Sequence, residues 1–338
     1  PLVSIILILM RLSGLQQDAA TTLKQIQIAL YTNIFIYIGV GIYLTGLVSK
    51  NLTIPFTEII QTLRDVRNGR FEKKVQVTTN DEIGYTGDVI NEMTDGLKER
   101  ERLQQSLNIA MEVQQNLLPA QDPQISGLDI AGTSIYCEET GGDYYDYLMT
   151  GEKDQQKICV VVGDVADHGV PSALLMTTAR AFLRQRTSRS GELDQVVSDV
   201  NRLLAHDVAD SGGFMTLFCL KIDRLNRKIS WVRAGHDPAL FYDPRSEAVE
   251  ELRGSGLAMG IDGDHEYEQY VKEDLAAGQI ILMGTDGIWE ALNGNNEMFG
   301  KERLRRIISK HAEAGAAEIL DAVYSELNTF TLGQKSED

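Results

Sequence analysis

The 338-residue sequence is poor in cysteine and has no excess of positive charge. Its three cysteines, Cys137, Cys159 and Cys219, form no C-x-x-C pair, so neither a disulfide framework nor a structural zinc site is indicated. The formal net charge is −17 at pH 7, and because no basic stripe offsets it, the composition argues against a nucleic-acid-binding protein. A reducing, cytoplasmic compartment suits the C-terminal half of such a chain.

Two short apolar runs rich in β-branched residues each end at a glycine beside an aspartate. Residues 158–162 precede Gly163-Asp164, and residues 280–283 precede Gly284-Thr285-Asp286-Gly287. Both runs are too short for an ordinary helix, so each is predicted to be a buried strand. Upstream, the paired glycines at the start of the segment 141–146 loosen the backbone ahead of two further acids.

Carboxylates on strand ends and loops, with no thiol or imidazole cluster near them, are the ligands that hard cations such as Mg²⁺ and Mn²⁺ prefer. We therefore predict a metal site made of aspartates. The alternative for any single Asp-Gly pair is an ordinary turn, because both residues are favoured there for backbone reasons. Three acid-glycine sites in one chain favour the metal site.

The N-terminal part of the sequence is apolar. Residues 1–10 are too few to cross a bilayer alone, and Pro1 opens directly into them, so we expect a fragment of a longer protein that begins inside a truncated transmembrane helix. A short polar connection completes the segment 1–27. Residues 28–48 carry no charge and predict a transmembrane helix, with a buried core helix as the alternative. Basic residues from Lys50 onwards place the rest in the cytoplasm by the positive-inside rule.

A helical pattern with a coiled-coil spacing follows the apolar segment. Apolar residues recur with a 4-3-4-3 spacing from Leu52 to Val66, and Gly69 ends the pattern. A second helix is predicted to start at Asp81, with acids in its first turn. Residues 49–98 resemble a HAMP linker, including Pro55, Asp81-Glu82-Ile83-Gly84, Asn91 and Met93. The resemblance implies a parallel four-helix bundle built from two chains, and therefore a homodimer.

Residues 99–118 are predicted to continue the second helix until Pro119 ends it. The apolar seam through this part contains two successive steps of three residues near Arg100, which is a stammer that overwinds a coiled coil locally. A solvated charged spacer is an equal alternative. If the stammer is present, residues 99–118 are predicted to be a helical signalling linker.

Residues 119–338 show short strands with helices among them, which indicates an α+β layered domain. Helices are predicted at residues 170–186, 193–209, 301–310 and 316–327. The segments 214–222, 228–234 and 239–242 are predicted to form a meander of three strands.

The acid motifs stand in the order G-G-D-x-x-D, G-D-V-x-x-H-G and T-D-G, with Ala234-Gly235-His236-Asp237-Pro238 between the last two. As a set they resemble the PPM-type metal-dependent Ser/Thr phosphatases, in their bacterial SpoIIE/RsbU-like branch. The resemblance runs from about Leu117 to the last residue. It implies a two-sheet β-sandwich flanked by helices.

The same resemblance implies two metal ions, Mn²⁺ or Mg²⁺, that activate water against a phosphate monoester. Asp143, Asp164 and Asp286 would be direct ligands and the catalytic residues, and the carbonyl of Val165 would be a further ligand. The last ligand of the family lies in an Asp-Asp pair before a closing strand. Asp338 would be the first or the second acid of that pair, and the final strand would be missing.

Other residues of the motifs have supporting roles by resemblance. Asp146 would be an outer ligand or lie in the second shell. Gly169 and Gly287 would keep the backbone close to the cluster without a clashing side chain. His168 and His236 are secondary candidates, because a loop histidine is more often a hydrogen-bonded structural group than an acid.

The implied function is a membrane-anchored protein phosphatase, with its HAMP and phosphatase regions on the cytoplasmic side of the inner or cytoplasmic membrane. The implied substrate is a phosphoserine or phosphothreonine on a STAS-type anti-anti-sigma protein. The alternative is a catalytically silent PPM-fold module that binds phosphoproteins or acts as a scaffold under HAMP control.

Two other enzyme classes are not supported by the residues. A cysteine-nucleophile phosphatase needs an arginine six residues after its cysteine, but Leu225 holds that place after Cys219. A sensor kinase would also suit a HAMP linker, but the region after Pro119 lacks glycine-rich nucleotide lids and a phospho-acceptor histidine helix.

Overall fold

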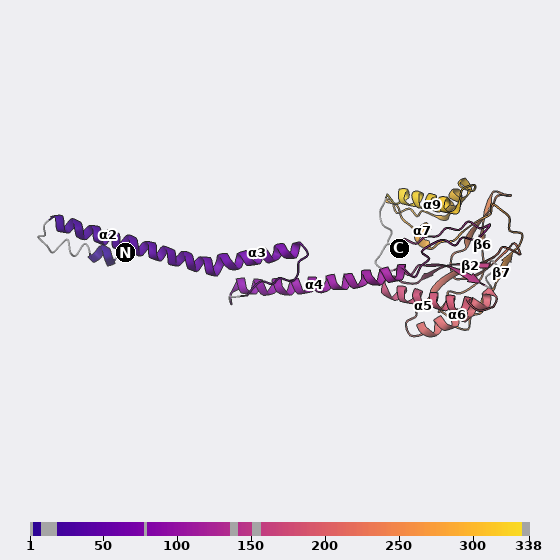
Figure 1. The fold of residues 1–338 in the computed structure, drawn as a ribbon, viewed down its shortest axis with the longest axis horizontal. Coiled ribbons are helices and arrows are strands. Elements are labelled where there is room, and N and C mark those ends of the chain that lie inside the picture. The colour runs from indigo at the N-terminus through magenta and orange to yellow at the C-terminus, as the bar shows by residue number, and fades with distance from the viewer. Residues whose placement is uncertain (1–2, 8–18, 78–79, 136–140, 151–156, 333–338) are drawn as a thin grey trace. The chain divides into compact units, whose positions relative to one another are not determined.

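The computed structural model describes residues 3–7, 19–77, 80–135, 141–150 and 157–332 (Figure 1). The chain divides into two compact units, Pro1–Gln105 and Ser106–Asp338. The boundary between them falls inside the segment that the sequence predicts to be a helical linker.

The first unit contains a long helical stretch. It consists of α2 (Ala19–Val48), a π-helical turn η1 (Ser49–Thr53) and α3 (Ile54–Arg67). Within the described residues, one helix is long and apolar enough to cross a membrane, by length and composition only, and its apolar window is not buried. Residues 19–27, the end of the expected polar connection, belong to α2, where alanine, leucine and lysine favour a helix.

The first unit also contains the start of α4 (Glu82–Gln115). Gly69 follows α3 with a φ of 73°, a left-handed conformation that favours glycine and ends the helix, as predicted. The carboxylate of Asp81 accepts hydrogen bonds from the backbone N–H groups of Ile83 and Gly84, both at 3.1 Å, and so caps α4. The predicted start of the second helix is therefore confirmed, and its end falls at Gln115, four residues before Pro119.

The side chain of Asn91 on α4 attaches to the backbone of the connector between α3 and α4. The Asn91 amide accepts from the Val75 N–H at 2.9 Å and donates to the Val75 carbonyl at 3.0 Å. Val75 packs with Ile59 and Ile90 in a small buried cluster. Other members of the predicted seam, Phe56 and Met93 among them, stay about half exposed in the single chain.

The second unit contains two antiparallel sheets. One has five strands in the order β1-β2-β3-β4-β7 and the other has three in the order β6-β5-β8. The strands are β1 (Tyr144–Thr150), β2 (Lys157–Val165), β3 (Met215–Asp223), β4 (Lys228–Ala234), β5 (Ala239–Asp243), β6 (Ala248–Leu252), β7 (Tyr270–Lys272) and β8 (Ile280–Leu282). The helices are α5 (Val170–Thr187), α6 (Leu193–Val208), α7 (Asp286–Trp289), α8 (Lys301–Lys310) and α9 (Ala316–Phe330).

Three apolar clusters form the core of this unit. The first joins the five-stranded sheet to α5 and α6, with Met176 and Leu204 fully buried. The second includes side chains of both sheets, such as Phe218 and Phe241. The third joins the three-stranded sheet to α8 and α9. The α+β sandwich flanked by helices is thus present, and Cys159 and Cys219 lie in it as free buried thiols, whereas Cys137 lies outside the described residues.

The predicted meander is wrong at its third strand. β3 and β4 pair, but β5 belongs to the other sheet. The chain turns away at Gly235, which has a φ of 70° and lies so close to the next segment that a Cβ there would stand 2.9 Å from the Ala258 nitrogen. Pro238 follows shortly after, and because it has no N–H it cannot donate a backbone hydrogen bond that would continue the pairing with β4.

Candidate active site

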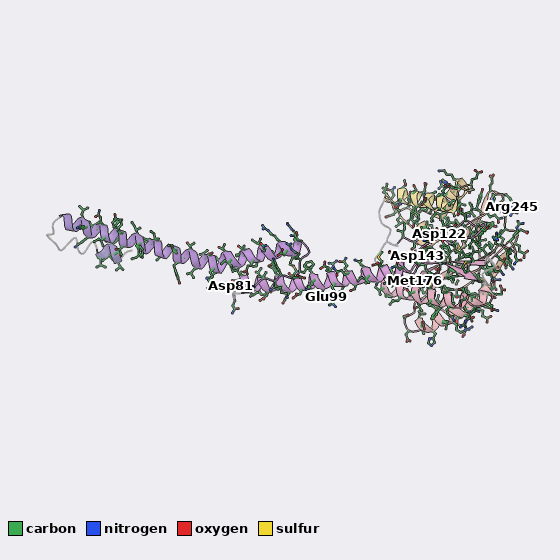
Figure 2. All side chains as sticks on the ribbon, in the orientation of Figure 1. Asp81, Glu99, Asp122, Asp143, Met176 and Arg245 are labelled. Atoms are coloured by element: carbon green, nitrogen blue, oxygen red, sulfur yellow. The ribbon has the colours of Figure 1, made fainter. Side chains whose placement is uncertain are left out.

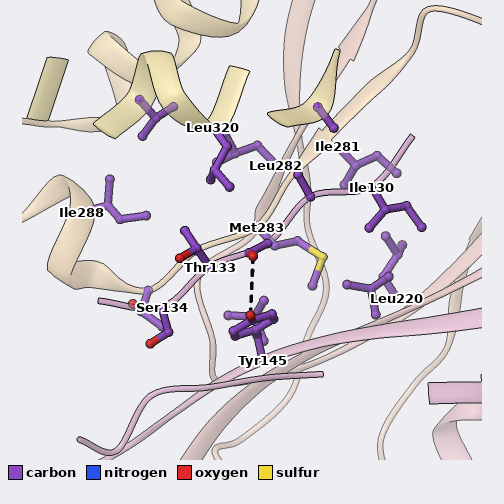
Figure 3. Close-up of a pocket in the computed structure, with 18 of the residues that line it drawn as sticks. Ile130, Thr133, Ser134, Tyr145, Leu220, Ile281, Leu282, Met283, Ile288 and Leu320 are labelled. Carbon is purple, nitrogen blue, oxygen red and sulfur yellow. Dashed lines mark hydrogen bonds between the residues drawn. The ribbon is translucent and has the colours of Figure 1, made fainter. Parts of the chain in front are cut away.

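Asp143, Asp164 and Asp286 line one cavity of about 1270 Å³ in the second unit. Asp143 stands directly before β1, Asp164 is the last residue but one of β2, and Asp286 is the first residue of α7. Figure 2 labels Asp143 within this unit. The same cavity has an apolar part, whose lining includes Ile130, Leu220, Ile281, Met283 and Leu320 (Figure 3).

The first and third acid motifs are in direct contact. The Thr285 hydroxyl donates a hydrogen bond to Oδ2 of Asp143 at 2.8 Å, across 142 residues of sequence. This bond fixes the orientation of the Asp143 carboxylate. Thr285 was not among the predicted site residues, although it is the first residue of the T-D-G motif.

The first and second motifs meet through their backbones. The Val165 N–H donates to the Gly142 carbonyl at 3.4 Å. A Cβ on Gly142 would stand 2.7 Å from the Val165 carbonyl oxygen, so a larger residue would push the two loops apart. Glycine before Asp143 therefore permits the close approach of the Val165 carbonyl to the acids.

His236 is buried, with 4% of its surface exposed, and both of its ring nitrogens have partners. Nδ1 lies 2.7 Å from the Thr216 hydroxyl, and Nε2 lies 3.1 Å from the Gly284 carbonyl. Burial lowers the pKa of His236 from 6.5 to about 4, so the ring is neutral at pH 7. His236 is thus a hydrogen-bonded structural group in this fold, as the sequence favours.

Asp146 has partners other than those expected of an outer metal ligand. Its carboxylate is fully buried and accepts two hydrogen bonds from the Arg184 guanidinium, both at 2.7 Å, and one from the Tyr144 hydroxyl at 2.9 Å. The physical reason is strand alternation: Asp143 precedes β1 at the cavity, whereas Asp146 belongs to the face of β1 covered by α5. Through these bonds Asp146 ties β1 to α5.

The loop after Asp164 leads into α5. His168 lines the cavity and is exposed. Gly169 has a φ of 80°, and its carbonyl accepts from the Ser172 hydroxyl at 2.8 Å. A Cβ on Gly169 would meet no described protein atom within 4 Å, and the positive φ favours glycine at this position. Gly287, in contrast, does line the cavity.

The end of α4 contacts the loop before Asp143. The Gln114 amide donates to the Gly141 carbonyl at 2.6 Å, and the side chain of Gln114 is 4% exposed. The other amide atom, Oε1, is buried without a hydrogen-bond partner among the described residues. The end of α4 is therefore bonded to the backbone just before the first acid.

The donor set fits a hard cation, although the part of the chain that the structure describes forms no closed ligand group. Within the described ranges, no three His, Cys, Asp or Glu side chains are grouped closely enough to hold an ion. Asp338, the expected last ligand, lies outside them. Asp143, Asp164, Asp286 and Val165, the expected ligands that do line the cavity, offer oxygen atoms, and such ligands suit Mg²⁺ or Mn²⁺.

The chain is similar to known phosphatases in sequence. The family model for Stage II sporulation protein E (SpoIIE) matches residues 154–338. Phosphoserine phosphatase RsbU of Bacillus subtilis (strain 168) is 28% identical over 228 residues, which cover 68% of this chain and 66% of that protein. Protein IcfG of Synechocystis sp. is 25% identical over 340 aligned positions, which cover 88% of this chain and 52% of that protein. The chain thus spans from about half to just under two thirds of these relatives.

A solved structure is similar in fold. The SiaA-PP2C domain of Pseudomonas aeruginosa aligns with a TM-score of 0.59 at 23% identity, covering 71% of this chain and 95% of that chain. This likeness concerns the arrangement of sheets and helices.

Proposed function

This chain belongs to the SpoIIE family and contains a serine phosphatase domain of the PPM type, and we propose that it hydrolyses phosphoserine or phosphothreonine on a partner protein. The observation that carries the proposal is the arrival of Asp143, Asp164 and Asp286 at one cavity from three separate segments. The names of two relatives, the phosphoserine phosphatases RsbU and RsbP of B. subtilis, support the choice of reaction.

Asp143, Asp164, Asp286 and the Val165 carbonyl would hold two Mn²⁺ or Mg²⁺ ions, with Asp338 completing the set. When bound, such ions supply a water of lowered pKa and neutralise charge on the phosphoryl oxygens. The chain's own residues position these oxygen atoms. Thr285 orients the Asp143 carboxylate by donating a hydrogen bond to it, and Gly142 lets the Val165 carbonyl approach the acids.

The proposal is tested with the full chain and a phosphoserine-containing protein. Phosphate release should require Mn²⁺ or Mg²⁺ and should stop when EDTA is added in excess, because every expected ligand is an oxygen donor. A phosphotyrosine protein serves as the matched control and should not be hydrolysed. Release that continues at an unchanged rate in EDTA would contradict the metal assignment.

A catalytically silent phosphoprotein-binding module is the second candidate. It is favoured by one observation, the lack of a closed group of metal-binding side chains in the part of the chain that the structure describes. The same assay separates the two: a silent module binds the phosphoprotein but releases no phosphate at any metal concentration.

As substrate we propose a STAS-type anti-anti-sigma protein carrying phosphoserine, since the motifs are of the RsbU-like branch. We further propose that the helix from Thr22 anchors the chain in the cytoplasmic membrane, with the phosphatase unit on the cytoplasmic side. The uncharged run at residues 28–48 and the basic residues that follow it support this placement.

A HAMP-like homodimer is the proposed form of the first unit. Phe56 and Met93, which are 52% and 46% exposed, are apolar side chains that a second copy would cover. Single cysteines at these positions, in a Cys137→Ser background, should therefore crosslink two chains in membranes. Cysteines at the exposed polar positions Arg64 and Asp88 are the controls and should not crosslink. Equal crosslinking at all four positions would contradict a specific bundle.

A further inference from the structure

A bridge of two side chains connects the second acid loop to the third. Thr216 on β3 pairs directly with Asp164 on β2 in the antiparallel register. From Thr216 the bridge passes to Nδ1 of His236 at 2.7 Å, and from Nε2 of His236 to the Gly284 carbonyl at 3.1 Å. Gly284 lies two residues before Asp286. The bridge also crosses between the sheets, because β3 belongs to the five-stranded sheet and Gly284 follows β8 of the other.

The hydrogen atoms in this bridge are fixed by the partners. The Gly284 carbonyl can only accept, so Nε2 of His236 must carry the proton. Nδ1 of the neutral ring is then an acceptor, and the Thr216 hydroxyl must donate to it. The Thr216 hydroxyl also lies 3.4 Å from the Asp164 carbonyl, a distance that leaves this second contact weak. Each member of the bridge therefore has one role, and valine in place of Thr216 would leave Nδ1 without its donor.

The surroundings prevent His236 from turning away. Its own carbonyl accepts a hydrogen bond from the Arg233 guanidinium. The next residue, Asp237, is ion-paired with Lys301 at 2.7 Å, and Lys301 lies over the Trp289 ring at 4.4 Å. The backbone on both sides of the ring is thus attached to β4 and to the start of α8. A buried ring whose backbone is fixed can hold the loops that it contacts at a constant distance from each other.

We infer that Thr216 and His236 are positioning residues that hold the Asp164 and Asp286 loops at a fixed spacing and thereby set the affinity of the acid cluster for divalent cations. The inference rests on the proposed function, in which these carboxylates bind the metal. Partners that orient ligands without touching the ion typically change metal affinity by 10-fold to 100-fold when they are removed. The competing explanation is that the bridge only stabilises the contact between the two sheets.

The test compares three variants of the full chain with wild type. Thr216→Val keeps the shape and the β-branch but loses the hydroxyl, Thr216→Ser keeps the hydroxyl, and Thr187→Val is the matched control. Thr187 is also buried, and its hydroxyl donates to the Leu183 carbonyl at 2.7 Å within α5. Mn²⁺ binding to metal-free protein is measured by isothermal titration calorimetry, and thermal unfolding without metal is followed by tryptophan fluorescence.

We expect Thr216→Val to weaken Mn²⁺ binding about tenfold, near the lower end of the usual effect for an indirect partner. Thr216→Ser should bind within about twofold of wild type, because the hydroxyl donor is retained. Thr187→Val should bind Mn²⁺ as wild type does, and its melting temperature should fall about as far as that of Thr216→Val. This pattern separates loop positioning from general stability.

A double replacement checks that both residues act through one bridge. His236→Phe retains a ring but removes both nitrogens, so Thr216→Val should weaken Mn²⁺ binding no further in that background. Unchanged Mn²⁺ affinity in Thr216→Val, or a further tenfold loss in the double variant, would overturn the inference. Failure of the wild type itself to bind Mn²⁺ would overturn the proposed metal site, and the positioning role with it.

Discussion

Replacing Asp164 or Asp286 by asparagine should reduce metal-dependent phosphate release by more than about 100-fold, since even indirect partners of a metal are worth up to that factor. Asparagine has nearly the shape of aspartate but lacks the negative charge that a divalent cation needs in a ligand. Both acids line the cavity from different segments, so neither can replace the other. The measurement is the initial rate of phosphate release from the phosphoserine protein at saturating Mn²⁺.

Asp199→Asn is the matched control for this loss of charge. Asp199 is an acid of α6 whose carboxylate pairs with Arg186 at 2.7 Å and which is not among the residues that line the cavity. Its variant should retain the wild-type rate. All three variants should melt near the wild-type temperature, because none removes apolar core. Wild-type rates in both Asp164→Asn and Asp286→Asn would contradict the assignment of these acids.

Removal of the Arg184 guanidinium should cost about 3–5 kcal/mol of unfolding free energy, the usual result of leaving a buried charge without its partner. Asp146 is fully buried, and its carboxylate accepts two hydrogen bonds from Arg184. In Arg184→Met the carboxylate would retain the Tyr144 hydroxyl at 2.9 Å and the Tyr147 N–H at 2.8 Å as donors. Arg180, whose Nε lies 3.9 Å from the carboxylate, compensates in part, so we expect the lower end of the range.

Tryptophan fluorescence during urea unfolding isolates this effect. The sequence has two tryptophans, Trp231 and Trp289, and both lie in the second unit, so the signal reports that unit alone. The control is Arg202→Met, which breaks an exposed pair with Asp199 and should change the unfolding free energy by no more than about 1 kcal/mol. In Asp146→Asn/Arg184→Met, where no charge is left buried, most of the lost stability should return. If Arg184→Met and Arg202→Met lowered the unfolding free energy by the same small amount, the buried pair would stabilise the unit no more than the exposed pair does.

Local patterns were enough for much of the second unit. The sequence predicted helices at 170–186 and 301–310, and the structure has α5 at Val170–Thr187 and α8 at Lys301–Lys310. It also placed β4 at residues 228–234, as observed. Each of these elements is specified by residues inside it or next to it, such as a proline in the first helical turn or a short apolar run. The short strands β6 and β7 were not predicted, because five and three residues are too few to show a clear hydrophobic periodicity.

The sequence by itself determined which acids could serve the site, because each sits in a motif where glycine and a strand end lie side by side. Only the tertiary structure decided which of them meet. Asp143 and Asp146 stand three residues apart, yet one carboxylate binds Thr285 and the other binds Arg184. The register of β2 with β3 places Thr216 opposite Asp164, and the left-handed turn at Gly235 brings His236 to Gly284 across the two sheets. These contacts join residues far apart in the chain, so they depend on pairing and packing that no local pattern contains.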